Sequence, residues 1–246
     1  MKLSCILPAH NEEGCIESTV RQLSNVLKEA QIDHEIRVIN DNSTDQTGIL
    51  LKELSREIKE LVVIDNDPPN GFGFAVRKGL ESFVGDVVCI NMADASDSPE
   101  DVVAFYNEIK VSQKDCVFGT RWSKGGKVID YPFIKKHVNR LANHFIRLLF
   151  RIKYNDITNA FKMYRAHVIP GLQPFLSPHF NLTVELPLKA IVRGYTYSVL
   201  PNSWTNRTSG ESKLKIKEMG SRYLFIVFYC LIEKWFSMGD YKKSSR

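Results

Sequence analysis

The sequence predicts an α/β protein with a Rossmann-like, mostly parallel central sheet flanked by helices. Short apolar runs of strand character alternate with segments whose apolar residues repeat at helical spacing. This alternation is typical of parallel βαβ units, in which ligands bind outside the carboxyl ends of the strands. The chain has 246 residues and is 43% apolar, which is enough for a buried core.

Residues 1–120 carry the alternation. The strand-like runs are 2–7, 34–39, 61–65 and a short run that begins after Gly85. Between these runs, apolar residues repeat at helical spacing. They are Ile16, Val20, Leu23 and Leu27, then Leu50, Leu51 and Leu54, and then residues within 74–83. Because crossovers between such strands are right-handed and keep them parallel, the carboxyl ends of all four should meet at one edge.

The elements after residue 120 follow a different pattern. The expected order is a Gly-rich basic loop at 121–132, a long amphipathic helix to about 152, a polar segment with a strand-like end at 156–164, a helix at 180–193, a strand at 195–200 and a polar loop at 202–213.

Positive charge is concentrated in the middle and near the end of the chain. The net charge is +5 and the isoelectric point is near 8.9, a balance that favours phosphates, nucleic acid or an anionic membrane surface. For 135–153 a solvated basic face is the simpler interpretation. The helical spacing of Val138, Leu141, Phe145 and Leu148 places an apolar stripe on the opposite side of that helix.

Two features bear on location. The five cysteines form no Cys-x-x-Cys pair and are expected to be buried free thiols in a reducing compartment. The N-terminal apolar run is too short for a signal peptide. We therefore expect a cytoplasmic catalytic domain. The apolar run 223–232 is shorter than the ~20 residues that span a bilayer. It is expected either to lie in a membrane interface or to pack on the core.

Polar residues at the strand ends predict a site for a metal-bound diphosphate. Glu12, Asp41, Asn70 and Asp94 each follow one of the four strands, and Asp97 lies three positions beyond Asp94. Mg²⁺ and Mn²⁺ prefer oxygen ligands and are commonly held by one or two carboxylates together with substrate phosphates. We therefore expect Asp94, supplemented by Asp97, to hold the metal.

A series of motifs resembles those of the family 2 glycosyltransferases, and within that family the dolichyl- and polyprenyl-phosphate sugar transferases. The order and spacing of these motifs carry the resemblance across about residues 3–215. They are 8–13, 40–47, 70–75 with Gly79, 85–94, Gly119-Thr120-Arg121 with Gly125-Gly126, 156–161 and 207–213.

The resemblance implies a GT-A fold over 1–215, with a nucleotide-sugar-binding half at 1–120, an acceptor half at 121–215 and a C-terminal apolar or amphipathic helix in 216–246. It implies a GDP- or UDP-sugar donor, Mg²⁺ or Mn²⁺, inversion at the anomeric carbon and a lipid-phosphate acceptor at a membrane surface. A small membrane-embedded partner is an alternative route to the acceptor, and no nucleic-acid partner is expected. Donor-binding residues carried over from the motifs are Pro8, His10, Glu12, Asp41, Asn70 and Gly73.

One position departs from the family pattern. Where the family commonly has Asp-x-Asp, this chain has Met92-Ala93-Asp94, so the first carboxylate is missing. This departure keeps open a protein of the same fold that binds substrates without turnover. A dinucleotide-binding fingerprint is disfavoured, because the first strand-to-helix turn lacks its glycines.

Charge considerations assign roles to the remaining candidates. Arg121, Arg207 and Lys213 would offset the negative charge that develops on the leaving diphosphate. A phosphate acceptor is already anionic and needs alignment more than a base. A sugar hydroxyl, as in polysaccharide synthesis, would need a base, for which Asp156 is the candidate. Nucleotidyl transfer remains a further alternative.

Overall fold

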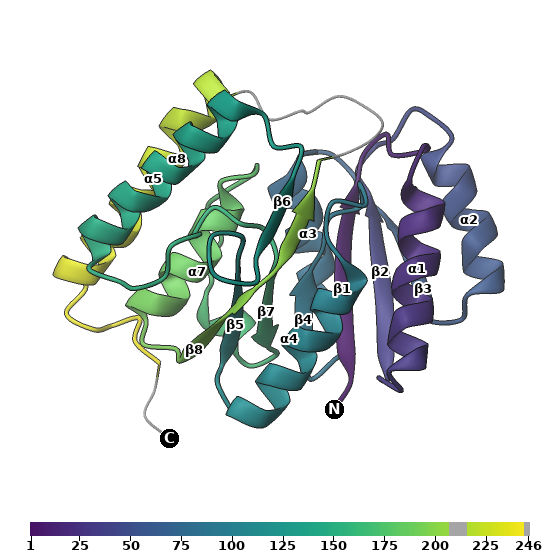
Figure 1. The fold of residues 1–246 in the computed structure, drawn as a ribbon, viewed down its shortest axis with the longest axis horizontal. Helices are drawn as coiled ribbons and strands as arrows, with labels where there is room; N and C mark the ends of the chain where they lie inside the picture. The colour runs from purple at the N-terminus through teal and green to yellow at the C-terminus, as the bar shows by residue number, and fades with distance from the viewer. Residues whose placement is uncertain (207–215, 244–246) are drawn as a thin grey trace.

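A seven-stranded sheet forms the centre of the protein (Figure 1). The structure is a computed structural model that describes residues 1–206 and 216–243, and the side chains of its last helix from Gly220 onward. The strands are β1 (Leu3–Ala9), β2 (His34–Asn40), β3 (Leu61–Asp65), β4 (Val87–Ile90), β5 (Cys116–Thr120), β7 (Lys162–Arg165) and β8 (Tyr197–Pro201). Their order is β3-β2-β1-β4-β7-β5-β8, and β7 is antiparallel to both of its neighbours. The predicted mostly parallel sheet is confirmed.

Helices cover both faces of this sheet. One face packs against α1 (Ile16–Glu29), α2 (Thr47–Glu57) and α4 (Pro99–Ser112), and the other against α3 (Phe72–Glu81), α7 (Leu182–Val192) and α8 (Ile216–Phe236), with α5 (Phe133–Phe150) beside them and the short α6 (Val168–Gly171) after β7. Alternation along β1 divides the two cores, because Leu3, Cys5 and Leu7 face one and Ile6 faces the other.

The carboxyl ends of the parallel strands lie at one edge, as predicted. Ala9 pairs with Asn40, Asn40 pairs with Asp65, and β4 follows the same direction beside β1. The first strand runs two residues past its predicted end at Leu7. Pro8 is accommodated there because β4 pairs with β1 only as far as Ile6, which leaves β2 as the one strand paired at that level.

The predicted division at residue 120 stays a prediction. β7, from the second half, lies between β4 and β5 of the first half. Two segments expected to be loops contain short strands, β6 (Lys127–Ile129) and β9 (Ser203–Thr205), which pair in parallel. Three-residue strands are too short to show the alternation on which a sequence-based assignment depends.

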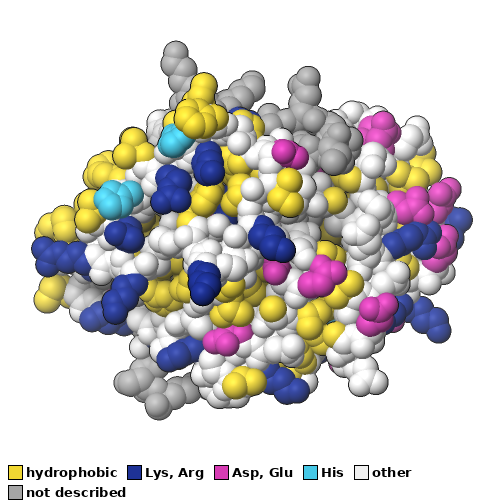
Figure 2. Space-filling model, viewed as in Figure 1, with side chains coloured by type: hydrophobic (Ala, Val, Ile, Leu, Met, Phe, Trp, Pro, Cys, Tyr) yellow, Lys and Arg dark blue, Asp and Glu magenta, His cyan; other side chains and the backbone are white. Residues whose placement is uncertain are grey.

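The orientation predicted for α5 is wrong. Its apolar residues Val138, Leu141, Phe145 and Leu148 are exposed, while Asn143, Ile146 and Phe150 are buried. Figure 2 shows hydrophobic side chains mixed with Lys, Arg and His over the flank that α5 occupies in Figure 1. Amide hydrogen bonds hold the inner face instead, since Asn143 Nδ2 donates to Thr158 Oγ1 at 2.9 Å and Asn143 Oδ1 accepts from Thr158 N at 3.2 Å.

The C-terminal helix α8 has one buried and one exposed apolar side. Ile226, Val227, Cys230 and Leu231 belong to the core, whereas Leu224, Phe225, Phe228 and Ile232 are exposed. Packing on the core therefore describes one side of the helix, and the membrane-interface interpretation of residues 223–232 stays a prediction. Within 1–206 and 216–243, no helix is both long enough and apolar enough to cross a membrane. All five cysteines are buried and free, as expected.

Candidate active site

Asp41 holds together the loops at the donor end of the predicted site. Its Oδ1 accepts from Asn66 Nδ2 at 2.7 Å and Asn70 Nδ2 at 3.1 Å, and its Oδ2 accepts from Gly71 N at 2.9 Å. The side chain is largely buried. Asp41 and Asn70, both predicted to bind the donor, are thus brought together. Their first function in this structure is to hold the β2–α2 and β3–α3 loops in place.

The first loop contributes His10 and Glu12 to the same edge. His10 Nδ1 lies 2.7 Å from Asp41 O, and Glu12 N donates to Thr47 Oγ1 at 2.8 Å. Glu12 is largely buried, and Pro8 lies on β1 just before this loop. His10 of the first loop therefore contacts Asp41 of the second, and Glu12 contacts Thr47 at the start of α2.

Gly73, also predicted to bind the donor, packs against a different segment of the chain. Its N–H donates to Pro178 O at 3.0 Å, and a Cβ at this position would lie 2.3 Å from Ser177 O. The glycine is needed for close approach of α3 to the 177–179 segment. A donor-binding role for Gly73 stays a prediction.

Asp94 and Asp97 lie in the turn between β4 and α4. Asp94 Oδ1 accepts from Ser96 N at 3.2 Å, and Asp97 Oδ2 accepts from Met92 N at 2.9 Å. Burial, partly offset by the Met92 N–H, and the neighbouring Asp94 carboxylate raise the pKa of Asp97 to about 7. Asp94 is only 8% exposed.

Backbone contacts tie this turn to β9, more than 100 residues later. Thr205 N donates to Ser96 O at 3.0 Å, Asp97 forms an isolated bridge with Trp204, and Ser203 N donates to Asp101 Oδ2. The predicted catalytic cations Arg207 and Lys213 lie outside the described residues. Their roles stay predictions.

Arg121 and Asp156 form a buried ion pair at the end of β5. Asp156 Oδ2 accepts from Arg121 N and Nε, each at 2.9 Å, and Asp156 Oδ1 accepts from Arg121 Nη2 at 2.8 Å. Burial opposes the guanidinium charge, but the adjacent carboxylate raises the pKa of Arg121. Asp156 is fully buried and its oxygens accept three hydrogen bonds from Arg121. Its role as a general base stays a prediction.

An aromatic and cationic cluster surrounds Arg121 and was missed by the sequence reasoning. Arg121, Lys136 and Arg140 lie over the Trp122 ring at 5.3–5.9 Å, and Tyr131 stands 4.8 Å from Trp204 between ring centroids. Cations stacked on aromatic rings gain electrostatic stabilisation. The signal in the sequence was the mixture of Trp, Tyr and basic residues in 121–140, but it does not indicate which rings and cations meet.

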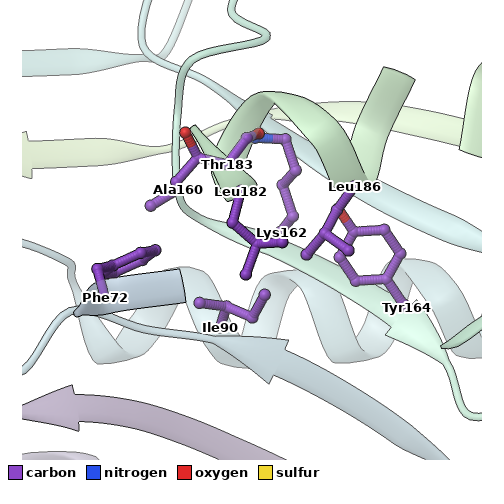
Figure 3. A pocket seen from close by; sticks show the side chains of 8 residues that line it. All are labelled: Phe72, Ile90, Ala160, Lys162, Tyr164, Leu182, Thr183 and Leu186. Carbon is purple, nitrogen blue, oxygen red and sulfur yellow. The ribbon is translucent and has the colours of Figure 1, made fainter. Parts of the chain in front are cut away.

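A second missed residue, Lys162, lies under the site on β7. Its Nζ donates to the carbonyls of Ile157, Asn159 and Thr183, linking the 156–161 motif to α7. Burial lowers the pKa of Lys162 to about 7. In Figure 3 the side chain extends along a cavity of about 10 Å³ between Phe72 and Tyr164. A nucleotide or sugar needs a site of several hundred Å³, so this cavity is not the donor site.

The carboxylate turn fits a hard divalent cation that takes one or two carboxylates from the protein and its other ligands from substrate phosphates. Within the described part of the chain, no group of three or more His, Cys, Asp or Glu side chains could hold a metal. Mg²⁺ is, however, commonly bound through one or two carboxylates plus substrate phosphates. Asp94 and Asp97 supply two oxygen-donor groups, and a cation bound there would offset the burial and the neighbouring Asp94 charge that raise the pKa of Asp97.

Comparison with known proteins gives consistent matches. The family model described as Glycosyl transferase family 2 matches residues 4–171. The chain is 32% identical to the dolichol-phosphate mannosyltransferase of Pyrococcus furiosus over 88% of its own length, but it spans only 60% of that relative. It is 25% identical to the undecaprenyl-phosphate mannosyltransferase of Micrococcus luteus, with 96% of each chain covered.

Solved structures show the same fold. The glucosyl-3-phosphoglycerate synthase of Mycobacterium tuberculosis, in complex with Mn²⁺, UDP-glucose and phosphoglyceric acid, superimposes with a TM-score of 0.72 at 18% identity, covering 95% of this chain and 79% of that one. The same enzyme with Mg²⁺ and UDP gives a TM-score of 0.68 at 18% identity, with the same coverage of both chains.

Proposed function

The chain belongs to glycosyl transferase family 2, and from this premise we propose that it transfers a sugar from a nucleotide-diphosphate sugar to a polyprenyl or dolichyl phosphate, with inversion at the anomeric carbon. Relatives named as dolichol-phosphate and undecaprenyl-phosphate mannosyltransferases support a lipid-phosphate acceptor. The observation that carries the proposal is the position of three residues along one edge of the sheet. Asp41 lies at the end proposed for the donor, Asp94 follows in the carboxylate turn, and the cation Arg121 lies beyond it.

The donor would lie across the carboxyl ends of β1, β2 and β4. Its nucleoside would contact the loops that Asp41 joins, with His10 and Glu12 beside it. Its diphosphate would then reach the turn of Asp94 and Asp97. Whether the base is guanine or uracil depends on contacts that these residues do not specify, so both GDP- and UDP-sugars belong in the test.

Asp94 and Asp97 would hold Mg²⁺ or Mn²⁺ together with the diphosphate. When bound, such a cation supplies positive charge that offsets the charge of the departing phosphate. The missing family carboxylate at Met92 does not remove the second acidic group, because the backbone of Met92 fixes Asp97 at the same turn. This geometry favours a working transferase over an inactive binding protein.

Arg121 would stabilise the anionic leaving group or acceptor, and Asp156 would hold it in the required orientation. A preorganised cation in a partly buried site costs no reorganisation during the reaction. Because the Asp156 carboxylate is occupied by Arg121, it is poorly suited to deprotonate a hydroxyl acceptor. This supports a phosphate acceptor, which is anionic before the reaction begins, over a sugar hydroxyl.

A lipid acceptor places the reaction at a membrane surface, and we extend the proposal to peripheral association on the cytoplasmic side. The exposed apolar side of α8 supports this location. Membrane surfaces bind helices that combine apolar and basic residues.

The test is incubation of the protein with labelled GDP- and UDP-sugars, a polyprenyl phosphate and Mg²⁺ or Mn²⁺. Formation of a lipid-linked sugar with release of nucleoside diphosphate is the expected result. Release of pyrophosphate would indicate nucleotidyl transfer. Sugar transfer only to a saccharide hydroxyl would show that the acceptor is a saccharide and not a lipid phosphate. Donor binding without turnover under all conditions would indicate a binding protein.

A further inference from the structure

Lys162 lies on β7 as a buried cation that forms no ion pair with any described residue. Its Nζ donates instead to three carbonyl oxygens, those of Ile157 at 3.1 Å, Thr183 at 3.3 Å and Asn159. Burial of an ammonium group is unfavourable unless its hydrogen-bonding partners are well placed. An apolar side chain would fill the same space without that penalty, so packing alone does not explain the lysine.

The three carbonyls lack their usual backbone donors. In a regular helix Thr183 O would accept from the N–H of residue 187, but Pro187 lies within α7 and has no N–H. Neither Ile157 O nor Asn159 O accepts a backbone hydrogen bond in the described part of the chain. An ammonium group has three N–H donors, one for each of these oxygens. Without Lys162, three carbonyls of buried residues would have no donor, which is destabilising.

Two of these carbonyls belong to residues 156–161, which we call the Asp156 turn. Asn159 N donates to Asp156 O at 3.1 Å within this turn. The Asp156 carboxylate in turn accepts three hydrogen bonds from Arg121. Lys162 therefore holds the backbone one residue and three residues beyond Asp156. A shift of these two carbonyls would move the carboxylate that orients Arg121.

The surroundings of Lys162 show that it acts through the turn and not on a substrate. The side chain is 1% exposed, and the cavity beside it, lined also by Phe72 and Tyr164, measures about 10 Å³ (Figure 3). This space is about the size of one water molecule, far below what a nucleotide or a sugar requires. It does leave room beside the lysine for a slightly larger side chain.

We propose that Lys162 is a positioning residue for Arg121, because its ammonium group holds the Asp156 turn in the shape that directs the Asp156 carboxylate at the guanidinium. The inference rests on the proposed function, in which Arg121 stabilises the anionic leaving group or acceptor. Misplacement of a reacting group by about 1 Å costs up to about a hundredfold in rate. The structural part of the inference, order in the turn, is measurable without any reaction.

The charge of Lys162 changes near neutral pH. Burial lowers the pKa of Lys162 to about 7. The charged groups that act on it are, in order of effect, Asp156, Arg121 and Asp97, while Glu185 and Lys189 of α7 pair with each other at 2.6 Å. Above this pH the neutral amine has two N–H donors for three carbonyls. The turn should therefore loosen as the pH rises through the pKa of Lys162.

Three variants test the proposal. Lys162→Met removes the ammonium and keeps a side chain of similar length. Lys162→Arg keeps a positive charge at every pH of the assay, and the adjoining cavity accommodates its larger head group. The matched control is Lys189→Met, because Lys189 is also fully buried but donates to Glu185 and to Pro174 O, outside the Asp156 turn.

Amide hydrogen exchange measures the turn directly, through the Arg121 N–H that donates to Asp156. In Lys162→Met this amide should exchange at least about tenfold faster than in the unmodified protein, whereas Lys162→Arg and Lys189→Met should stay close to it. After correction for the intrinsic rate, its protection should fall between about pH 6 and pH 8 in the unmodified protein and stay constant in Lys162→Arg.

Unchanged exchange in Lys162→Met, or equal acceleration in Lys189→Met, would overturn the proposal. If Lys162→Met does not fold, the pH dependence decides. The same protection profile in the unmodified protein and in Lys162→Arg then counts against the role of the ammonium, and a fall in protection confined to the unmodified protein supports it.

Sugar transfer provides the second measurement. Lys162→Met should lower kcat at least about tenfold with little change in the KM for the donor, and Lys162→Arg should restore most of the loss. The alkaline limb of the kcat profile, with a pKa of about 7, should be absent from Lys162→Arg. Undiminished kcat in Lys162→Met would overturn the proposal. No transfer by the unmodified protein, with the expected exchange results, would reject the proposed function and leave the positioning of Arg121 intact.

Discussion

At the scale of single residues, the ion pair between Arg121 and Asp156 has the strongest consequence for mechanism. Both side chains are buried, and the carboxylate accepts two hydrogen bonds from the guanidinium and one from the Arg121 backbone. Removing one partner of a buried pair leaves the other charge uncompensated. The pair therefore sets both the stability of this loop and the orientation of the cation.

We expect Asp156→Asn to lower the free energy of unfolding by about 3–5 kcal/mol and to lower kcat, because Arg121 loses its ionic partner. The dissociation constant for nucleoside diphosphate should change little. A pH–rate profile separates positioning from catalysis. If Asp156 were the general base, the acidic limb of the profile would disappear in the variant, whereas a positioning residue leaves the limb in place.

The adjacent carboxylates Asp94 and Asp97 lead to a second expectation. Asp94→Asn should abolish metal-dependent transfer without lowering the melting temperature, since an amide oxygen can still accept from Ser96 N and repulsion with Asp97 is removed. Asp97→Asn should reduce activity less. Titration of activity with Mn²⁺ checks both variants. Undiminished turnover of Asp94→Asn would show that Asp94 does not hold the metal. Equal losses in the two variants would show that Asp94 and Asp97 bind the metal jointly.

Asp41 combines a structural role with a proposed binding role. Asp41→Ala removes the acceptor for three donors and should destabilise the protein by about 2–4 kcal/mol. It should also weaken nucleoside diphosphate binding, with the acceptor constant nearly unchanged. Asp41→Asn is the matched control, because it keeps some of the hydrogen bonds. Calorimetric titration that gives the same dissociation constant for Asp41→Ala and the unmodified protein would place the nucleotide elsewhere.

At the scale of elements, α5 and α8 show that an apolar stripe does not by itself identify the buried side of a helix. Periodicity in α5 correctly predicts a helix, but its buried residues include Asn143, and its most regular apolar stripe is exposed. The inner surface combines Ile146 and Phe150, which pack in the core, with Asn143, which hydrogen-bonds to Thr158.

The two sides of α8 should respond differently to the same change. Leu231→Ser removes a buried side chain and should lower the free energy of unfolding by about 2–5 kcal/mol. Phe225→Ser, Phe228→Ser and Ile232→Ser alter exposed positions and should each cost less than about 0.5 kcal/mol. Urea denaturation measures both. Similar losses at all four positions would mean that the whole helix is buried.

At the scale of the whole molecule, Asp115 links the start of β5 to the C-terminal segment. Its carboxylate accepts from Thr196 N and Oγ1, and from Lys243 Nζ at 2.8 Å, with His167 Nε2 at 3.1 Å. Burial opposes the carboxylate charge, but the hydrogen bonds of Lys243, Thr196 and His167 outweigh it and lower the pKa of Asp115 to about 2.

Because the pKa of Asp115 is lower in the folded protein than in the unfolded chain, the free energy of unfolding depends on pH. The contribution, about 2 kcal/mol from the size of the shift, is present above pH ~4 and is lost as the pH falls towards 2, because the unfolded state takes up the proton first. Asp115→Asn should remove this dependence. Thermal unfolding between pH 2 and 5 provides the measurement, and an unchanged slope in the variant would assign the acid sensitivity to other groups.

Local pattern was sufficient for the parallel strands of residues 1–120 and for their ligand-binding edge. Strand runs that end in polar clusters, separated by helical spacing, leave few alternatives once parallel pairing and right-handed crossover are required. Asp41, Asn70 and Asp94 were placed together on that basis alone. Each lies within a few residues of a strand end, where position along the chain nearly determines position in space.

Tertiary contacts decided everything that depends on partners distant in sequence. The pairing of Asp156 with Arg121, the backbone use of Gly73, the burial of Lys162 and the outward stripe of α5 each involve segments between 15 and more than 100 residues apart, or a choice between two faces of one helix. Sequence periodicity determined which residues share a face. Only the competing hydrogen bonds, close backbone approaches and desolvation of the folded chain determined which face turned inward and which charges remained available for chemistry.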